Sequence, residues 1–457
     1  MNDDVRTFSR KSIVPAFAVV AVSAIAVGAT LGIADPKLAR AAIVAGVVLV
    51  LWLTELLPLY ATTMVLWVGC VLLLSPLDPT NFALPRVLST AASPVMALFF
   101  GGFALSAAGS KYGIDGFIAG WMVRFSGGTR AGLLLTIMMG TAVLSMWMSN
   151  IAAGAMMVAT LRPLFGRPED QADDGGAFRR ALLLGVAFAA DFGGIGTPIG
   201  TGPNLIAIGA VEGRVRITFL QWMMFGVPMA ALMIAVTFGL LVWLHGVRGR
   251  VSATGGIEQR SLDRRGWLVV VIFFCAVAGW LTEPLHGVPA ALVALAIAAA
   301  LFGTRLLDTS DLARLEWDTL LLVAGGLTLG HLFDASGLAV ATASAVDWNA
   351  LHPAVFLFAL LLASALISAI ASNTAAAAML IQIALGIAPS PATAVLVALG
   401  ASMGVPFVIS TPPNSMVYGK GGLSGRDFFV PGIALMVLGC ALLTVAGPRA
   451  LRWVGIP

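Results

Sequence analysis

Long apolar runs separated by short polar stretches dominate the hydrophobic pattern of the chain. In the first half, such runs lie near residues 13–34, 40–57, 60–76, 93–111, 182–210 and 218–245. A membrane-spanning helix needs roughly 17–25 mostly apolar residues, so the pattern predicts an all-α polytopic membrane protein. The first run is longer than the roughly 7–15 apolar residues at the core of a cleaved signal peptide. We therefore expect it to be retained as a membrane helix.

The longest polar interruption falls near the middle of the chain, at residues 247–265, and the segments on its two sides resemble each other. The sequence WLTE at 52–55 returns at 280–283, and the pair Ser149-Asn150 returns as Ser372-Asn373. GTGPN at 200–204 corresponds to STPPN at 410–414. Because the matches occur in the same order in both halves, we infer an internal duplication.

The duplication defines the expected domain organisation. Residues 1–39 form an extra N-terminal transmembrane helix, residues 40–246 the first repeat, and residues 266–457 the second repeat, with residues 247–265 as a cytoplasmic linker. Each repeat is expected to contain five spans. An odd number of spans forces the second repeat to enter the membrane in the opposite orientation, which is the inverted-repeat plan of many secondary transporters.

Two segments do not fit simple crossings. Residues 131–165 and 353–387 are long enough for two short helices, but too short for two full spans at about 1.5 Å per residue. We expect each to form a re-entrant hairpin, the first from the cytoplasmic side and the second from outside. Glycines and prolines interrupt the apolar runs at 193–204 and 404–414. These positions predict two broken helices.

Composition and charge agree with a membrane protein. Of the 457 residues, 59% are hydrophobic and 11% are charged, compared with about 25% charged residues in soluble domains. Arginines gather in the N-terminal head, in residues 162–180 and in the linker. By the positive-inside rule these segments are cytoplasmic, which predicts an inner-membrane protein with its N-terminus inside and its C-terminus outside. Arg449 and Arg452 do not fit this assignment. The basic residues are not gathered on one segment, so the net charge of +4 gives no sign of a nucleic-acid partner, and we expect none.

The Ser-Asn pairs are expected at the hairpin tips. Irregular backbone at membrane depth survives only where protein buries it or where it lines a cavity. Side-chain oxygens and freed carbonyls at such tips bind small cations, while the N-termini of half-helices face anions. A single Ser-Asn pair is more often a packing contact between helices. Its duplication beside two broken helices favours a binding site.

With these motifs, the chain resembles the divalent anion/sodium symporter family of di- and tricarboxylate and sulfate carriers. The resemblance rests on WLTE followed by Pro58, the paired Ser-Asn motifs, GTGPN and STPPN. It implies eleven membrane spans, two hairpins, a homodimer built on a scaffold domain, and elevator-type movement of a transport domain.

The resemblance also implies site residues. A first Na⁺ site would use Ser145, Ser149, Asn150 and Gly200. A second would use Ser368, Ala371, Asn373 and Ser410. The anion would contact Asn150, Thr201, Gly202, Ser372, Asn373, Thr374, Thr411 and Pro412. Since no Lys or Arg occurs in these motifs, an anion bound here has to be coupled to its cations.

Three positions depart from the family pattern. Ile151 stands where a threonine follows the Ser-Asn pair, and Gly202 replaces the first proline of TPPN. Asp191 stands where a small polar residue is expected, and an ionisable group at that depth is a functional candidate that either titrates or only pairs within the bundle. If it titrates, H⁺ replaces Na⁺ in part.

The expected function is Na⁺-coupled uptake of a C4-dicarboxylate such as succinate, malate or fumarate, with no organic cofactor. Sulfate or another oxyanion, and Na⁺-independent or H⁺-coupled anion exchange, remain alternatives. A channel or a membrane-embedded enzyme is disfavoured. Inverted repeats with hairpins suit alternating access better than a continuous pore, and the sequence has no nucleophile–base pair, metal cluster or nucleotide motif.

Overall fold

The computed structural model describes residues 35–114, 116–117, 125, 127–165, 176–250, 261–344 and 352–457. Within these ranges the chain forms helices and no named strand, which confirms the all-α prediction. The expected N-terminal helix near residues 13–34 lies outside the described residues. The central part of the expected linker, residues 251–260, also lies outside them.

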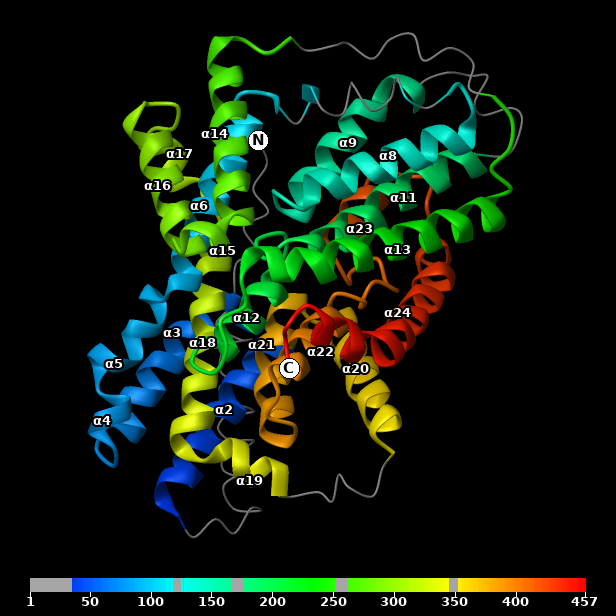
Figure 1. The fold of residues 1–457 in the computed structure, drawn as a ribbon. Coiled ribbons are helices and arrows are strands. Elements are labelled where there is room, and N and C mark those ends of the chain that lie inside the picture. The colour runs from blue at the N-terminus through cyan, green and yellow to red at the C-terminus, as the bar shows by residue number, and fades with distance from the viewer. Residues whose placement is uncertain are drawn as a thin grey trace, which may run out of the picture.

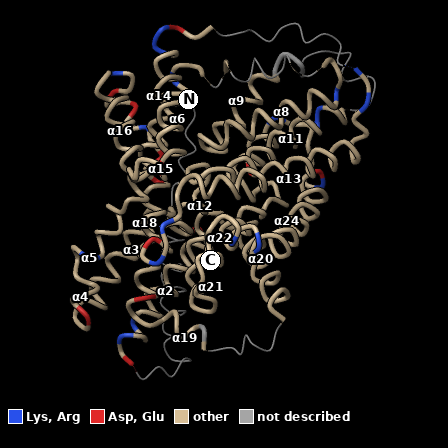
Figure 2. The backbone as a smooth tube through the Cα atoms, in the orientation of Figure 1, with Lys and Arg blue, Asp and Glu red and all other residues tan. Residues whose placement is uncertain are grey.

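Seven helices of the described ranges are long and apolar enough to cross a membrane. They are α2 (Pro36–Thr54), Leu84–Lys111, α13 (Phe219–His245), α14 (Arg264–Leu281), α18 (Trp317–Ser336), α20 (Pro353–Ile370) and α24 (Gly425–Trp453). Figure 2 shows most charged residues near helix ends and in connections, with long stretches of uncharged residues between them. This distribution is what an apolar solvent around the helix middles requires, because a charged side chain there is costly.

The two halves contain the same kinds of element in the same order. The remaining first-half helices are α3 (Leu59–Gly69), which continues as a π-helical turn Cys70–Leu74, α4 (Pro79–Phe82), α5 (Leu84–Leu88), α6 (Pro94–Lys111), α8 (Arg130–Ser145), α9 (Asn150–Phe165), α11 (Ala177–Gly193) and α12 (Gly202–Val211). Those of the second half are α15 (Glu283–His286), α16 (Ala290–Gly303), α17 (Thr309–Ala313), α19 (Leu338–Ser344), α21 (Asn373–Ile387), α22 (Pro391–Ala401) and α23 (Pro412–Tyr418). In each half a helix hairpin is followed by an interrupted helix and then by a long helix.

The hairpins and interruptions coincide with the expected segments. The α8–α9 pair turns between Ser145 and Asn150, and the α20–α21 pair turns between Ile370 and Asn373. The helix pairs α11–α12 and α22–α23 are interrupted at the glycine- and proline-rich stretches. One difference concerns α20, which is itself long enough to cross a membrane, although it was expected to be only half of a re-entrant hairpin.

Local interactions recur between the halves. Trp52 and Trp280, from the two WLTE sequences, are both buried. The indole nitrogen of Trp52 donates to the carbonyl of Leu59 at the start of α3, and that of Trp280 donates to the carbonyl of Ala290 at the start of α16. The repeated sequence therefore makes the same junction between two helices in each half.

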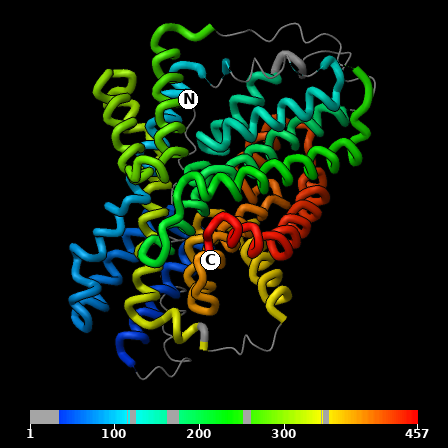
Figure 3. The backbone as a smooth tube through the Cα atoms, viewed as in Figure 1, coloured from blue at the N-terminus to red at the C-terminus, as the bar shows by residue number. Residues whose placement is uncertain are grey.

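The two halves are interleaved in space. In Figures 1 and 3, α3 to α6 and α14 to α18 lie on the left of the molecule, whereas the hairpins, α13 and α24 lie mainly on the right. α6 packs against α16, and α18 contacts α2, α3, α12 and α21. A helix of the second half thus lies among helices of the first. This arrangement brings the interrupted helices and hairpin tips of both halves to the middle of the molecule.

Close contact between α6 and α16 depends on a glycine. A methyl group on Gly101 would lie 2.4 Å from the carbonyl oxygen of Ala294. On the same helix, a methyl group on Gly109 would meet nothing within 4 Å. Because the atoms opposite Gly101 are mainly backbone, they cannot move aside by a change of rotamer. Gly101 is therefore a packing residue, as expected for glycine pairs in membrane helices.

We predict that Gly101→Ala destabilises the protein by about 1–3 kcal/mol through overpacking. Thermal melting of the purified protein in detergent measures this as a lower Tm. Gly109→Ala, which adds the same methyl group on the same helix, should leave Tm unchanged or slightly raised. Equal melting temperatures for the two variants would show that α6 and α16 can move apart to accept the added methyl group without loss of stability.

Candidate functional site

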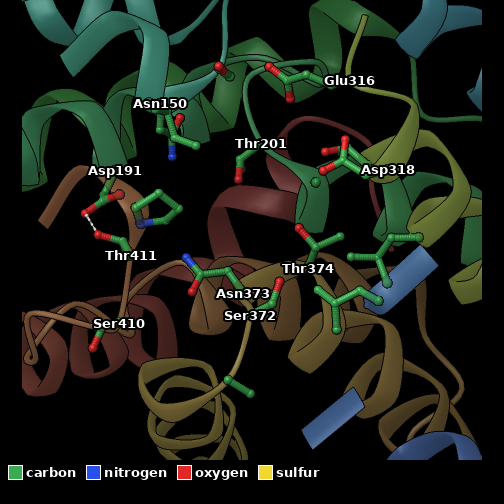
Figure 4. Close-up of a pocket in the computed structure, with 18 of the residues that line it drawn as sticks. Asn150, Asp191, Thr201, Glu316, Asp318, Ser372, Asn373, Thr374, Ser410 and Thr411 are labelled. Carbon is green, nitrogen blue, oxygen red and sulfur yellow. Dashed lines mark hydrogen bonds between the residues drawn. The ribbon is translucent and has the colours of Figure 1, made fainter. Parts of the chain in front are cut away.

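A cavity of about 830 Å³ lies where the hairpin tips meet the interrupted helices (Figure 4). The residues expected to contact an anion all line it: Asn150, Thr201, Gly202, Ser372, Asn373, Thr374, Thr411 and Pro412. Of the other residues expected at cation sites, Ser149, Gly200, Ala371 and Ser410 line it too. Ser145 and Ser368 are fully buried behind the cavity wall. Segments far apart in the sequence therefore meet at one place.

Several helix N-termini point at this cavity. The N-cap residues of α9, α12, α21 and α23 are Ser149, Thr201, Ser372 and Thr411, and all of them line it. Backbone N–H groups and the positive end of the helix dipole favour a negative charge at such positions. Neither Thr201 nor Ser372 caps its helix through its side chain. Their hydroxyls are therefore available to a ligand.

The first Ser-Asn motif gathers oxygen atoms. Ser145 Oγ lies 2.7 Å from Asn150 Oδ1 and 2.6 Å from the carbonyl oxygen of Ala190. The same end of the Asn150 amide lies 3.3 Å from the carbonyl oxygens of both Ala190 and Gly200. We call these four atoms, on Ser145, Asn150, Ala190 and Gly200, the first oxygen cluster.

The amide of Asn150 fits this cluster in two ways. With its nitrogen facing the cluster, it donates to the surrounding oxygens. With its oxygen facing the cluster, four oxygens meet and the serine proton satisfies one of them, so the remaining lone pairs repel unless a cation lies between them. The cluster is therefore either closed by a hydrogen-bonded amide or suited to a cation.

The second motif repeats this geometry. Ser368 Oγ lies 2.7 Å from Asn373 Oδ1 and 2.6 Å from the carbonyl oxygen of Ala401. We call Ser368, Asn373 and Ala401 the second oxygen cluster. Ser410, the counterpart of Gly200, uses its hydroxyl to donate to the carbonyl of Ala369 and to accept from the N–H of Phe407. These two bonds use the proton and one of the two lone pairs of the Ser410 hydroxyl.

The interruptions in α11–α12 and α22–α23 are held by asparagine side chains. Asn204 Nδ2 donates to the carbonyls of Gly194 and Thr197 at 2.9 and 2.8 Å. Asn414 Nδ2 donates to those of Val405 and Phe407 at 3.0 and 2.9 Å. These carbonyls have lost their helical partners, and both asparagines are completely buried. The final Asn of GTGPN and of STPPN is therefore a structural residue that shapes the site.

The charged residues that line the cavity are all acidic. They are Glu55, Asp191, Glu316 and Asp318, and no Lys, Arg or His is among the described lining residues. Glu55 and Glu283 are the equivalent glutamates of the two WLTE sequences. Glu283 is buried and pairs with Arg216, but Glu55 lies on the cavity wall. The two equivalent glutamates thus differ in environment.

Sequence reasoning missed Glu316 and Asp318. Glu316 is the N-cap of α18, and it lines the cavity together with Ser149 of the first hairpin tip. The sequence offered one indication of their importance. Both residues stand at the start of the helix with Gly-Gly at 325–326, which corresponds to the first-half helix with Gly-Gly at 101–102.

Two departures from the family pattern are connected through the cavity. A methyl group on Gly202 would lie 2.3 Å from Oγ1 of Thr374. Thr374 therefore occupies space that a proline ring at position 202 would need. The counterparts of Gly202 and Thr374 are Pro412 and Ile151, which both line the cavity, and Ile151 is half exposed there. One side of the cavity thus has a glycine and a hydroxyl, and the other has a proline and an aliphatic side chain.

A family model described as a citrate transporter matches residues 48–400, which is well over half of the chain. The chain belongs to the citrate transporter family. An uncharacterized transporter of Haemophilus influenzae is 27% identical over 435 residues, covering 90% of this chain and 92% of the relative. The sodium-dependent dicarboxylate transporter SdcS of Staphylococcus aureus is 27% identical over 418 residues, covering 82% of this chain and 78% of SdcS.

Solved transporter structures share the fold of this citrate transporter family member. The YdaH transporter of Alcanivorax borkumensis gives a TM-score of 0.57 at 16% identity, covering 83% of this chain and 89% of YdaH. MtrF of Neisseria gonorrhoeae gives 0.53 at 12% identity, covering 81% and 85%. Together with the apolar helices, these findings make the chain a multi-pass membrane transporter. They also confirm the family-level resemblance to divalent anion/sodium symporters.

We predict that Asn204→Ala and Asn414→Ala each destabilise the protein by about 2–4 kcal/mol, since each removes a buried amide that donates to two carbonyls of an interrupted helix. Melting curves in detergent measure the effect. Asn81→Ala is the control, because Asn81 is only half-buried and its side-chain amide donates a hydrogen bond to Asp78, outside the cavity. If all three variants melt alike, the asparagines do not hold the interrupted helices.

Proposed function

We propose that this transporter imports a C4-dicarboxylate such as succinate, malate or fumarate together with Na⁺. The observation that carries the proposal is a pair of equivalent oxygen clusters at one cavity on which several helix N-termini converge. Oxygen clusters suit cations, and helix N-termini suit anions. A cavity offering both favours binding of an anion and its counter-ions in one step.

The absence of basic residues from the described cavity wall explains why the ions would be coupled. A dicarboxylate without a Lys or Arg partner has only N–H groups and hydroxyls to replace its hydration. Acidic side chains at the same cavity disfavour it further. Cations in the oxygen clusters supply the missing positive charge, so the anion binds well only after Na⁺ has bound. The family implies this use of Ser145, Ser149, Asn150 and Gly200, and of Ser368, Ala371, Asn373 and Ser410.

The relatives support the choice of ions. SdcS is by name a sodium-dependent dicarboxylate transporter. The family model is described as a citrate transporter, and a cavity of about 830 Å³ has room for a tricarboxylate. Citrate is therefore the second candidate. Ile151 removes one hydroxyl on one side of the cavity, while Thr374 keeps one on the other, which favours the smaller dianion.

Transport would follow from the duplicated architecture. We propose that residues 40–246 and 266–457 form inverted repeats in the inner membrane, with the N-terminus in the cytoplasm and the C-terminus outside. The group containing the hairpins and interrupted helices would move as an elevator against the group containing α6, α16 and α18, in a homodimer. Glu316 of α18 and Ser149 of the first hairpin tip line the same cavity, so this movement would separate them.

The membrane potential constrains the number of cations. Moving a charge against the potential costs about 2.3 kcal/mol per 100 mV. Two Na⁺ only cancel the charge of a dianion. A third monovalent cation would give each cycle one net positive charge, so that the membrane potential drives uptake and transport is electrogenic.

The test uses thermal stabilisation of the purified protein and uptake by proteoliposomes. Succinate should raise Tm in Na⁺ and much less in K⁺, and uptake of labelled succinate should require an inward Na⁺ gradient. Saturation and counterflow distinguish a carrier from a channel. Citrate and sulfate are compared under the same conditions. Succinate uptake that is equally fast in Na⁺ and in K⁺ at every pH would refute Na⁺ coupling and leave exchange.

We predict that Ser145→Ala and Ser368→Ala each raise the Na⁺ concentration for half-maximal uptake by about tenfold, since loss of one ligand costs on the order of 1–2 kcal/mol. Thr237→Ala is the matched control. Its hydroxyl is equally buried but bonds only the carbonyl of Met233 within α13. Na⁺ dependence that is the same in all three variants would exclude the serines from the cation sites.

A further inference from the structure

Asp191 is a buried carboxylate that joins the two halves of the protein. It lies on α11 of the first half, and its Oδ2 accepts a hydrogen bond of 2.9 Å from Oγ1 of Thr411, the N-cap of α23 in the second half. Only 3% of its surface is exposed. Figure 4 shows the carboxylate beside the cavity, with Asn150 on one side and Thr411 on the other.

One oxygen of this carboxylate has no partner. Oδ1 of Asp191 is buried and accepts no hydrogen bond from any described residue, although the residue lines the cavity. The hydrogen bond from Thr411 stabilises a carboxylate but leaves its net charge. An uncompensated charge in a buried site is strongly unfavourable. The charge must therefore be neutralised by a bound cation or by a proton.

The surroundings of Asp191 favour a cation. No Lys, Arg or His occurs among the described residues that line the cavity, so no side chain there supplies the positive charge. The neighbouring residue, Ala190, contributes its carbonyl to the first oxygen cluster. Asp191 thus lies between the first oxygen cluster and the cavity, but it is not one of the residues assigned to either cluster.

We propose that Asp191 is the protein ligand of an additional monovalent cation, bound between the two halves beside the transported anion. This inference rests on the proposed function, because it concerns the same cavity and the same ion coupling. It identifies the residue that would hold the third cation required for uptake driven by the membrane potential. The cation would bridge Asp191 Oδ1 and the anion, which explains why an acidic residue is tolerated in an anion site.

The fixed charge of Asp191 then determines the electrical behaviour of the carrier. With a dianion and three monovalent cations bound, the site including Asp191 is neutral, whereas the empty site is negative. Each cycle therefore brings in one net positive charge, and the potential acts on the return of the empty site. Replacing Asp191 by asparagine removes both the fixed charge and the third cation. The remaining cycle, with two cations per dianion, is electroneutral.

The experiment measures charge and flux together in proteoliposomes containing the full-length protein. Labelled succinate uptake is recorded at imposed potassium-diffusion potentials, and the transport current is recorded under the same ion gradients. The wild type should move one positive charge per succinate. Asp191→Asn should still take up succinate, with no current, no dependence on potential, and a Na⁺ Hill coefficient lower by about one. Asp334→Asn, which removes an exposed carboxylate on α18, should behave as the wild type.

Each other outcome has a defined meaning. An Asp191→Asn variant that keeps the wild-type charge-to-succinate ratio and Na⁺ cooperativity overturns the proposal. A variant that becomes electroneutral while its Na⁺ cooperativity is unchanged, with H⁺ uptake seen in the wild type, also overturns it, because the neutralising ion is then a proton. If the wild type itself ignores Na⁺, the proposed function fails and the cation site at Asp191 fails with it, a result distinct from a Na⁺-dependent wild type with an unchanged Asp191→Asn variant.

A second measurement covers the case in which Asp191→Asn binds ions but does not move. The Tm of purified wild type, Asp191→Asn and Asp191→Glu is followed as Na⁺ is added at saturating succinate. The rise of Tm with Na⁺ concentration should correspond to one fewer bound Na⁺ in the asparagine variant than in the wild type. The glutamate variant should bind the same number of Na⁺ ions as the wild type. Identical Na⁺ dependence in all three proteins would show that the carboxylate binds no cation.

Discussion

The structure depends on how a helical membrane protein satisfies backbone groups that are not in helices. In an apolar solvent each unpaired carbonyl or N–H group is costly, so irregular backbone needs partners from the protein or from a cavity. Here Asn204 and Asn414 supply donors to four carbonyls at the two interruptions. The interrupted helices can then end inside the molecule, with their N-termini directed at a common cavity. The site exists because the breaks are stabilised.

The same constraint explains why serine, asparagine and glycine recur in both halves. Ser145 and Ser368 bring a hydroxyl between a side-chain amide and a carbonyl of the adjacent interrupted helix. Gly193 and Gly404 let that helix approach the hairpin, since a methyl group on either would lie 2.5 Å from the backbone of Ala142 or Ala365. Ligand geometry and close packing are thus produced by one short set of residues in each half.

The two halves differ in the residues that they contribute to the cavity. Gly202 faces Thr374, whereas their counterparts are Pro412 and Ile151. Asp191 has no acidic counterpart, because Ser402 stands at the corresponding place before the second interruption. Two halves with matching motifs therefore present an asymmetric cavity.

The sequence determined the elements of this protein and the tertiary structure determined their relations. The apolar runs, the Pro and Gly interruptions and the duplicated motifs predict the helices, hairpins and breaks, since these depend on local backbone chemistry and on the thickness of the membrane. The same motifs predicted most of the polar residues that line the cavity. Glu316, Asp318 and Glu55 could not be placed there from the sequence, because their position depends on how α18 and α2 pack against the hairpin tips. Likewise, only packing between the halves brings Thr411 to Asp191 and Thr374 to Gly202. Contacts between residues about 170 to 220 positions apart follow from three-dimensional packing, which local periodicity does not encode.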